Sequence, residues 1–161
     1  MAAVQNRFPE IAAVHTRTTL EVLGELSPGA DARVRARLAP DVREALDAAA
    51  RSDFLPAMVD LDVAMAIHAE LGLDAARRVA RECLRRSLTG TVLGGLVRSA
   101  AALFGLTPPG LLRWAGRGYG RVCRDCGDLS VTSTEDGLVR LLLAGLPEGL
   151  EAPSYLESMA G

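Results

Sequence analysis

The sequence contains no lysine and few aromatic residues. All 18 of its basic residues are arginines, a pattern typical of genomes rich in G and C. Aromatic residues make up 4% of the 161 residues, so the core must be built mainly from Leu, Val and Ala, a composition that favours helices. The formal net charge is −2, which excludes a general attraction to nucleic acids or anionic membranes.

The sequence also has no long uninterrupted apolar segment and few cysteines. The longest apolar run, residues 88–106, contains Arg98, and a charge near the middle of a membrane span is costly. We therefore expect a buried helix there. The first residues have neither a basic region nor an uninterrupted apolar region of the kind found in secretory leaders. Together with the three cysteines, this predicts a cytoplasmic protein with free thiols.

Hydrophobic periodicity and capping signals predict about seven helices in a single domain, residues 1–161. Helix starts are marked by Ser, Thr, Asp or Pro, and several ends by glycine. The predicted helices cover residues 9–25, 28–38, 40–51, 60–71, 74–88, 91–104 and 107–124. Residues 51–56 are predicted to form a connector. Residues 153–161 are typical of the start of an eighth helix, so we expect a further helix and strands to follow them.

After Gly127 the hydrophobic period changes from that of a helix to that of a strand. Residues 129–134 and 138–144 flank a Glu-Asp-Gly turn signal and predict an antiparallel hairpin. Both faces of its second strand are largely apolar, and a lone hairpin is marginal in water, so we expect another element to cover it. The predicted fold class is α+β, predominantly helical, with one small antiparallel sheet near the C-terminus.

Cys123 and Cys126 form the only C-x-x-C pair, for which three interpretations compete. A redox centre needs a helix N-terminus, where the dipole favours thiolate, but the predicted helix places both cysteines at its C-terminal end. A structural zinc site needs a second ligand pair, and the remaining candidates, Cys83, His15 and His68, have no paired spacing. We favour the third interpretation, small and partly buried thiols at a helix end, and predict neither a metal nor another cofactor.

Other candidate motifs also favour structural roles. Gly116, Gly118 and Gly120 form a G-x-G-x-G pattern without the preceding strand of a dinucleotide site, so we interpret them as small residues that admit a neighbouring element. His68 is a candidate haem ligand or general base, but a lone helical histidine is more often a core or boundary residue. The same interpretation applies to His15. Because the sequence assembles no Ser/His/Asp or Cys/His arrangement, we predict that the protein is not an enzyme.

Two series of arginines recur at helical spacing. Arg113, Arg117, Arg121 and Arg124 are expected on one face of the last predicted helix, and a second series lies within residues 77–85. Such rows bind phosphates or an acidic partner, or form a solvated face paired with carboxylates. We name the first series as a partner or anion surface. Nucleic-acid binding is not predicted, because no recognition helix or aromatic platform accompanies the charge.

Several segments resemble an uncharacterised protein family expanded in myxobacteria. They are FLPAMVDLDVAMAIHAELG at 54–72, LFGLTPPGLLRWAGRGYGRVCRDCGDL at 103–129, and an apolar hairpin that closes on GLP. The similarity covers most of the chain, residues 8–156. More distantly, helices followed by a helix-to-hairpin unit are similar to the vinyl-reductase-like and haem–nitric-oxide-binding sensor folds. That resemblance implies a small-molecule site between helices and a curved antiparallel sheet.

We therefore expect a non-enzymatic cytoplasmic sensor or signalling domain that binds a small apolar ligand. The ligand would contact Phe104, Trp114, Tyr119 and Leu141. The alternative is a protein-interaction adaptor or homodimerisation domain that uses the hairpin and the arginine-bearing helix. An enclosed apolar cavity of about 300 Å³ or more would favour the sensor, whereas a filled core with an exposed apolar patch would favour the adaptor. Neither nucleic acid nor a membrane is an expected partner.

Overall fold

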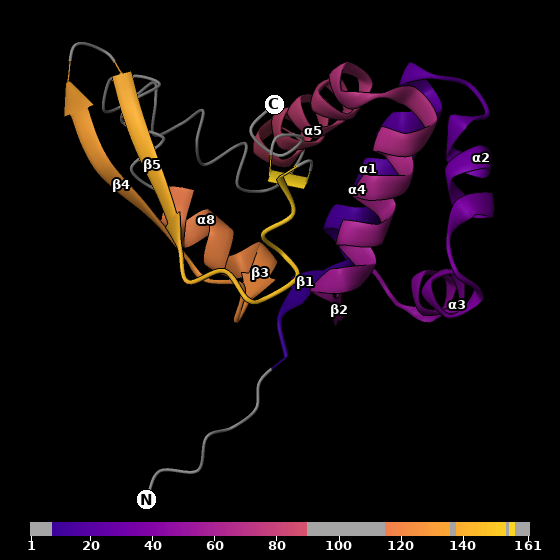
Figure 1. Ribbon diagram of the computed structural model, residues 1–161, viewed down its shortest axis with the longest axis horizontal. Coiled ribbons are helices and arrows are strands. Elements are labelled where there is room, and N and C mark those ends of the chain that lie inside the picture. Colours follow the sequence, from indigo (N-terminus) through magenta and orange to yellow (C-terminus); the bar gives the residue numbers. More distant parts are fainter. Residues whose placement is uncertain (1–7, 90–114, 136–137, 154, 157–161) are drawn as a thin grey trace, which may run out of the picture.

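The structure is a computed structural model that describes residues 8–89, 115–135, 138–153 and 155–156. The fold is α+β and predominantly helical, as predicted, with six helices in the described residues (Figure 1). The predicted helix at 91–104 lies outside these residues. The elements are β1 (Glu10–Ala12), α1 (Ala13–Leu26), α2 (Ala30–Arg37), α3 (Pro40–Ala48), β2 (Phe54–Pro56), α4 (Ala57–Leu71), α5 (Leu73–Thr89), α8 (Ala115–Val122), β3 (Cys123–Arg124), β4 (Asp128–Glu135) and β5 (Leu138–Ala144).

Three short strands form an antiparallel sheet that the sequence did not indicate. In the order β2-β1-β3, β1 pairs with β2 through Ile11 and Leu55, and with β3 through Ile11 and Cys123. The prediction that the first helix begins at Pro9 is therefore wrong, because residues 10–12 form β1 and the helix begins at Ala13. The prediction of a connector at 51–56 is wrong for residues 54–56, which form β2. Long-range pairing with two other segments outweighs the local helical preference of residues 10–12.

The main core lies among α1 to α5. Leu23 and Val34 are fully buried, Leu46 is 1% exposed, and Val63 of α4 is fully buried in the same apolar cluster. Local signals set the ends of these helices. Pro40 occupies the first turn of α3, and Gly72, with φ of 81°, ends α4 while its N–H donates to the carbonyl of His68. In the residues that the structure describes, no helix is long and apolar enough to cross a membrane.

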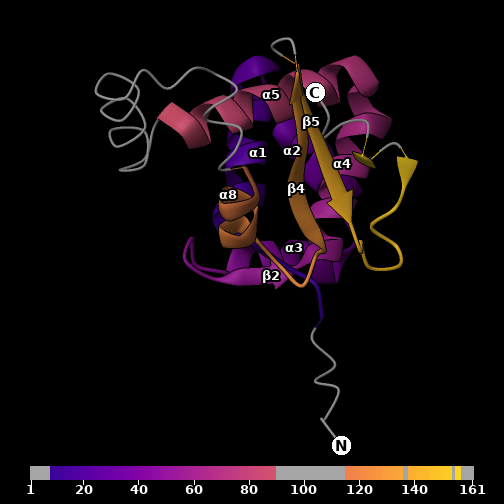
Figure 2. The same ribbon diagram turned by 90° about the vertical axis from the view of Figure 1, so that its left-hand side faces the viewer.

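The predicted hairpin is confirmed, and α8 lies against its first strand. β4 and β5 pair antiparallel, with a bulge between Val131 and Ser133, and Figure 2 shows α8 beside β4. A Cβ at Gly116 would come 2.3 Å from the carbonyl oxygen of Leu129, so this contact requires glycine. The interpretation of the glycines as packing residues is confirmed at Gly116. It is not confirmed at Gly118 or Gly120, where no atom of the described residues lies within 4 Å of the Cβ position.

Two leucines of α1 provide a test of the core. Leu23 is fully buried, whereas Leu26 is 53% exposed. We expect Leu23→Ala to lower the free energy of unfolding by about 2–5 kcal/mol, because it removes buried methyl groups and leaves a cavity. Leu26→Ala should change it by less than about 0.5 kcal/mol. Urea denaturation of both variants measures the difference, and equal effects would contradict the described packing.

Candidate functional site

A buried carboxylate connects three parts of the chain. Asp60, in the first turn of α4, is 6% exposed. It accepts hydrogen bonds from the hydroxyl of Thr16 on α1 at 2.8 Å and from that of Tyr155 at 3.0 Å. The amino end of α4 favours a negative charge at this position. Burial, and next the nearby Asp60, raise the pKa of Tyr155 far above its usual value, so its hydroxyl stays a donor.

A cysteine and a histidine meet on the other side of α1. The Sγ of Cys83 on α5 lies 3.9 Å from Nδ1 of His15, and the hydroxyl of Thr19 donates to the same sulfur at 3.6 Å. Burial opposes a charge on His15, but the contact with Cys83 and the charge of Asp60 outweigh it and raise its pKa to about 9. No local pattern predicts this Cys/His pair, because its members are separated by 68 residues.

Cys123 and Cys126 lie immediately after the C-terminal end of α8. The helix ends at Val122, before both cysteines, because Cys123 pairs with β1. Cys126 is 4% exposed and its thiol contacts the carbonyl of Glu10 at 3.3 Å. The hydroxyl of Tyr119 donates to the carbonyl of Cys126 at 2.8 Å. The prediction of partly buried thiols at the trailing end of a helix is confirmed, although the helix does not include them.

The environment of these thiols opposes thiolate formation. Burial, and then the neighbouring Cys126 and Asp60, raise the pKa of Cys123 to about 12. Burial also raises the pKa of Cys126. These directions are opposite to that of a catalytic C-x-x-C pair. In the described part of the chain, no group of three or more His, Cys, Asp or Glu side chains is arranged to hold a metal ion.

A small cavity lies beside the C-x-x-C turn. Its volume is about 20 Å³, and Tyr119, Cys123, Cys126, Leu143 and Tyr155 contribute to its lining. This volume is enough for about one water molecule and far below that of a drug-sized ligand.

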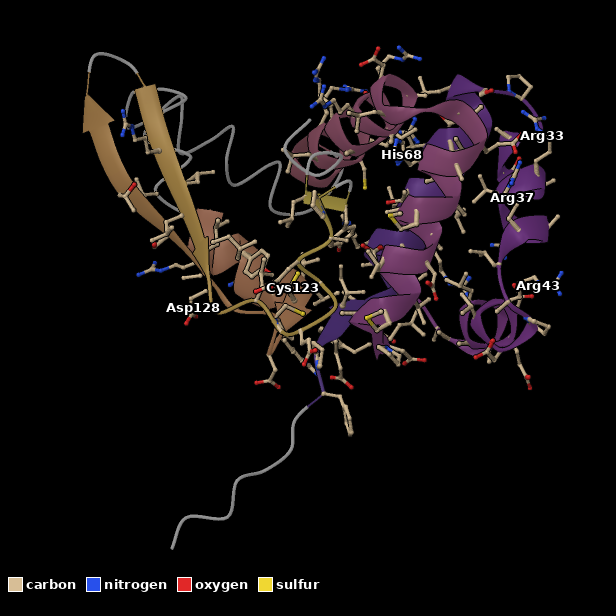
Figure 3. All side chains as sticks on the ribbon, viewed as in Figure 1. Arg33, Arg37, Arg43, His68, Cys123 and Asp128 are labelled. Atoms are coloured by element: carbon tan, nitrogen blue, oxygen red, sulfur yellow. The ribbon has the colours of Figure 1, made fainter. Side chains whose placement is uncertain are left out.

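The predicted ligand residues are not brought together where the structure describes them. Phe104 and Trp114 lie outside the described residues. Tyr119 lines the small cavity, whereas Leu141 does not and is 45% exposed on β5. His68 is half-buried near the end of α4, as a boundary residue should be, and Figure 3 shows it well away from Cys123.

The four arginines of the predicted surface do not share one helical face. Arg117 and Arg121 are exposed on α8, and Arg113 lies outside the described residues. Arg124 belongs to β3, where its guanidinium stacks 3.4 Å from the ring centroid of Phe54. The prediction for Arg124 is wrong because the helix ends at Val122.

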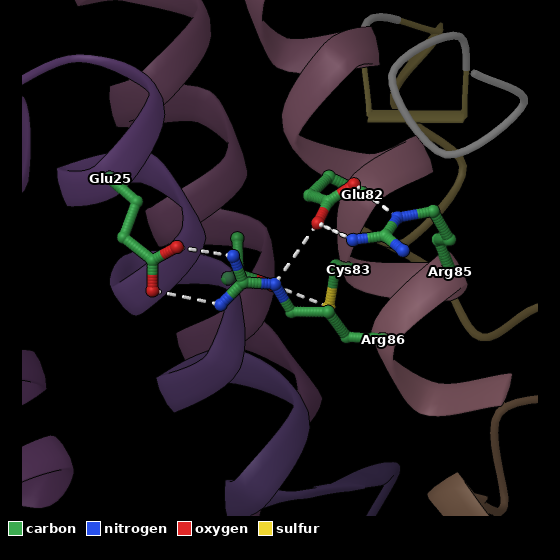
Figure 4. Close-up of polar contacts among 6 residues, drawn as sticks. Glu25, Glu82, Cys83, Arg85 and Arg86 are labelled. Atoms are coloured by element: carbon green, nitrogen blue, oxygen red, sulfur yellow. Dashed lines mark hydrogen bonds and ion pairs between the residues drawn. The ribbon is translucent and has the colours of Figure 1, made fainter. Parts of the chain in front are cut away.

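The second arginine series is partly paired with carboxylates. Arg85 and Arg86 both donate to Glu82, and Arg86 also contacts Glu25 of α1 (Figure 4). Hydrogen bonds from Arg85 and then Arg86 lower the pKa of Glu82 to about 2. At Arg85 this supports the interpretation of a solvated face with paired charges, and the bond from Arg86 joins α5 to α1.

Comparison of the chain with family models, curated proteins and solved structures gives no match. The resemblances drawn from the sequence therefore stay predictions.

The raised pKa of His15 predicts an unusual titration. Because its pKa of about 9 in the folded protein exceeds the usual histidine pKa of 6.5, protonated His15 stabilises the fold below about pH 6.5, and this contribution is lost as the pH rises through 9. We expect the imidazole proton resonances to titrate near pH 9 in a His68→Gln variant, where His15 is the only histidine. Adding Cys83→Ala should lower the midpoint by removing a favourable partner. A midpoint near the usual histidine pKa of 6.5 in the His68→Gln variant would contradict the described contact.

Proposed function

We propose that this chain is a non-enzymatic protein-interaction domain that forms homodimers through the outer edge of β5. The observation that carries the proposal is the exposure of two adjacent leucines on that strand. Leu141 is 45% and Leu142 is 51% exposed. Because neighbouring residues of a strand point to opposite faces, apolar surface is present on both faces of the ribbon at one point.

The edge of β5 is available for pairing within the described structure. β4 and β5 form a two-stranded sheet, and no further described strand pairs with β5. α8 packs beside β4 rather than beside β5. A two-stranded ribbon is marginally stable in water, and an unpaired edge with little charge is a template for another strand. Pairing with a second β5 produces a four-stranded sheet.

The sequence of β5 suits antiparallel pairing with a second copy. With the two-fold axis at Leu141, Arg140 faces Leu142 of the second copy, and Val139 faces Leu143. This register avoids placing the two arginines directly opposite each other, which would be destabilising. The symmetric arrangement uses the same patch on both chains, as closed dimers do.

The described residues give less support to the small-molecule sensor. The cavity that Tyr119 lines has a volume of about 20 Å³, whereas an apolar ligand needs about 300 Å³ or more. The adaptor requires instead a filled core and exposed apolar side chains, which the helical cluster and β5 provide. We assign the domain to the cytoplasm, because its three cysteines are free thiols, which persist in reducing compartments.

Charge on the β5 edge should prevent dimer formation. We expect the wild-type chain to sediment with twice the mass of one chain, and the double variant Leu141→Lys/Leu142→Lys to weaken dimerisation about 100-fold or more, because lysines on an edge strand oppose pairing. The measurement is sedimentation equilibrium over a range of concentrations.

The matched control is Leu84→Lys, since Leu84 is 60% exposed on α5, outside the hairpin. It should dimerise like the wild type. Circular dichroism establishes that each variant is folded. A monomeric wild-type chain at high concentration, or a dimer unaffected by the double substitution, would exclude the proposed interface.

A further inference from the structure

We propose that Cys123 and Cys126 are a site of reversible oxidation, which low-molecular-weight disulfides such as oxidised glutathione convert to an intramolecular disulfide. This inference does not depend on dimerisation. It concerns a pair of thiols for which the fold gives no metal-binding or catalytic role.

The backbone brings the two sulfurs together. Cys123 is held in β3 by pairing with Ile11, and the chain then turns back through Asp125, whose φ is 53°. The left-handed region is accessible to Asp without the penalty that larger side chains meet. The two cysteines line the same cavity of about 20 Å³. Both side chains therefore meet at one small site, which formation of a sulfur–sulfur bond requires.

A surface hollow lies beside this turn. Phe8, Glu10, Arg124 and Asp125 line an open hollow of about 420 Å³. Arg124 and Asp125 are the two residues between the cysteines, so the hollow lies directly beside the turn. In the lining of the hollow, the guanidinium of Arg124 complements the carboxylates of a small peptide disulfide, and the carboxylates of Glu10 and Asp125 complement its ammonium group. Cys123 is the more exposed of the two thiols.

The reaction consists of two thiol–disulfide exchanges. The thiolate of Cys123, after loss of its proton to solvent, attacks one sulfur of the small disulfide and releases the first small thiolate. Cys126 then loses its proton and attacks the Cys123 sulfur of the mixed disulfide, which releases the second small thiolate. The two electrons lost by the cysteines reduce the small disulfide to two thiols, which take up the two protons.

The thiol environment makes this exchange slow without disfavouring its product. Since burial and neighbouring groups raise the pKa of Cys123 to about 12, little of the attacking thiolate is present at neutral pH. Some C-x-x-C disulfides are strongly oxidising because their reduced form is stabilised as a thiolate. The environment of Cys123 gives the reduced form no such stabilisation. The neutral disulfide has no charge to bury. The pair is thus suited to a slow modification rather than to rapid turnover.

Oxidation changes the attachment of the turn to β1. Besides a contact with the carbonyl of Arg124 at 3.2 Å, the thiol of Cys126 in the reduced form contacts the carbonyl of Glu10 as a donor at 3.3 Å. A disulfide has no S–H, so this contact loses its hydrogen bond while the pairing of Cys123 with Ile11 stays in place. The expected result is weaker contact between the turn and β1 only at Cys126.

The test is oxidation of the full chain in buffers containing reduced and oxidised glutathione. After acid quenching and alkylation, mass spectrometry and peptide mapping identify the modified cysteines. We expect the wild type and Cys83→Ser to form one disulfide between residues 123 and 126. Its rate should rise about tenfold per pH unit between about pH 7 and pH 10, in proportion to the thiolate fraction. Cys123→Ser and Cys126→Ser should form no intramolecular disulfide.

Three results would overturn the proposal: glutathione adducts that persist on the wild type without resolution, disulfides that link two chains instead, or no oxidation of the folded wild type while the urea-unfolded chain reacts. Circular dichroism of the serine variants checks their folding. The measurement repeated on Leu141→Lys/Leu142→Lys should give the same disulfide, so failure of this inference and failure of the proposed dimer are separate outcomes.

Discussion

The hydrogen bonds to the buried carboxylate of Asp60 determine how two apolar clusters fit together, one among α1 to α5 and one that contains Cys126 and Tyr155. A buried carboxylate without donors is strongly destabilising, so Thr16 and Tyr155 must both reach it. They come from segments 44 residues before and 95 residues after Asp60. α4 accordingly packs on two sides. Val63 belongs to the cluster of α1 to α5, whereas Leu61 belongs to a second cluster with Cys126, Leu150 and Tyr155. This explains why α4 is apolar almost all round instead of along one stripe.

The charge of Asp60 also explains opposite effects on the groups around it. It favours the protonated, cationic form of His15 and opposes the anionic forms of Cys123 and Tyr155. A single carboxylate in a poorly solvated place acts on all of them because little water screens it. The thiol of Cys123 is therefore kept protonated by its position in the fold, in addition to its place after the carboxyl end of α8, whose dipole acts in the same direction.

Residues that act through their neighbours in sequence were predictable, and residues that act through distant partners were not. The start of α3 follows from Pro40, the end of α4 from Gly72, and the hairpin from its alternation and turn. The predicted start of α2 at Pro28 with Ser27 as its N-cap is wrong, because α2 begins at Ala30 after Gly29. β1, β2 and β3 are each two or three residues long and exist only through mutual pairing. The contact between Cys126 and Glu10 spans 116 residues, and no local pattern encodes it. The prediction for Arg124 is wrong for the same reason, since pairing with β1 ends the helix at Val122, before Arg124.

The hairpin is fixed to the rest of the fold by backbone approaches that only glycine permits. Gly116 places α8 against the carbonyl of Leu129, near the start of β4. A Cβ at Gly127, with φ of 86°, would lie 2.5 Å from the carbonyl of Ala144, at the end of β5. Gly127 directly follows Cys126 and precedes β4, so the turn that holds the cysteines also sets the direction in which the hairpin leaves the core. Both strands are thus anchored at the same end, and Leu141 lies in the middle of β5 while Leu142 lies two residues before Ala144. An edge held in this way loses little conformational entropy when a second strand binds, which favours pairing.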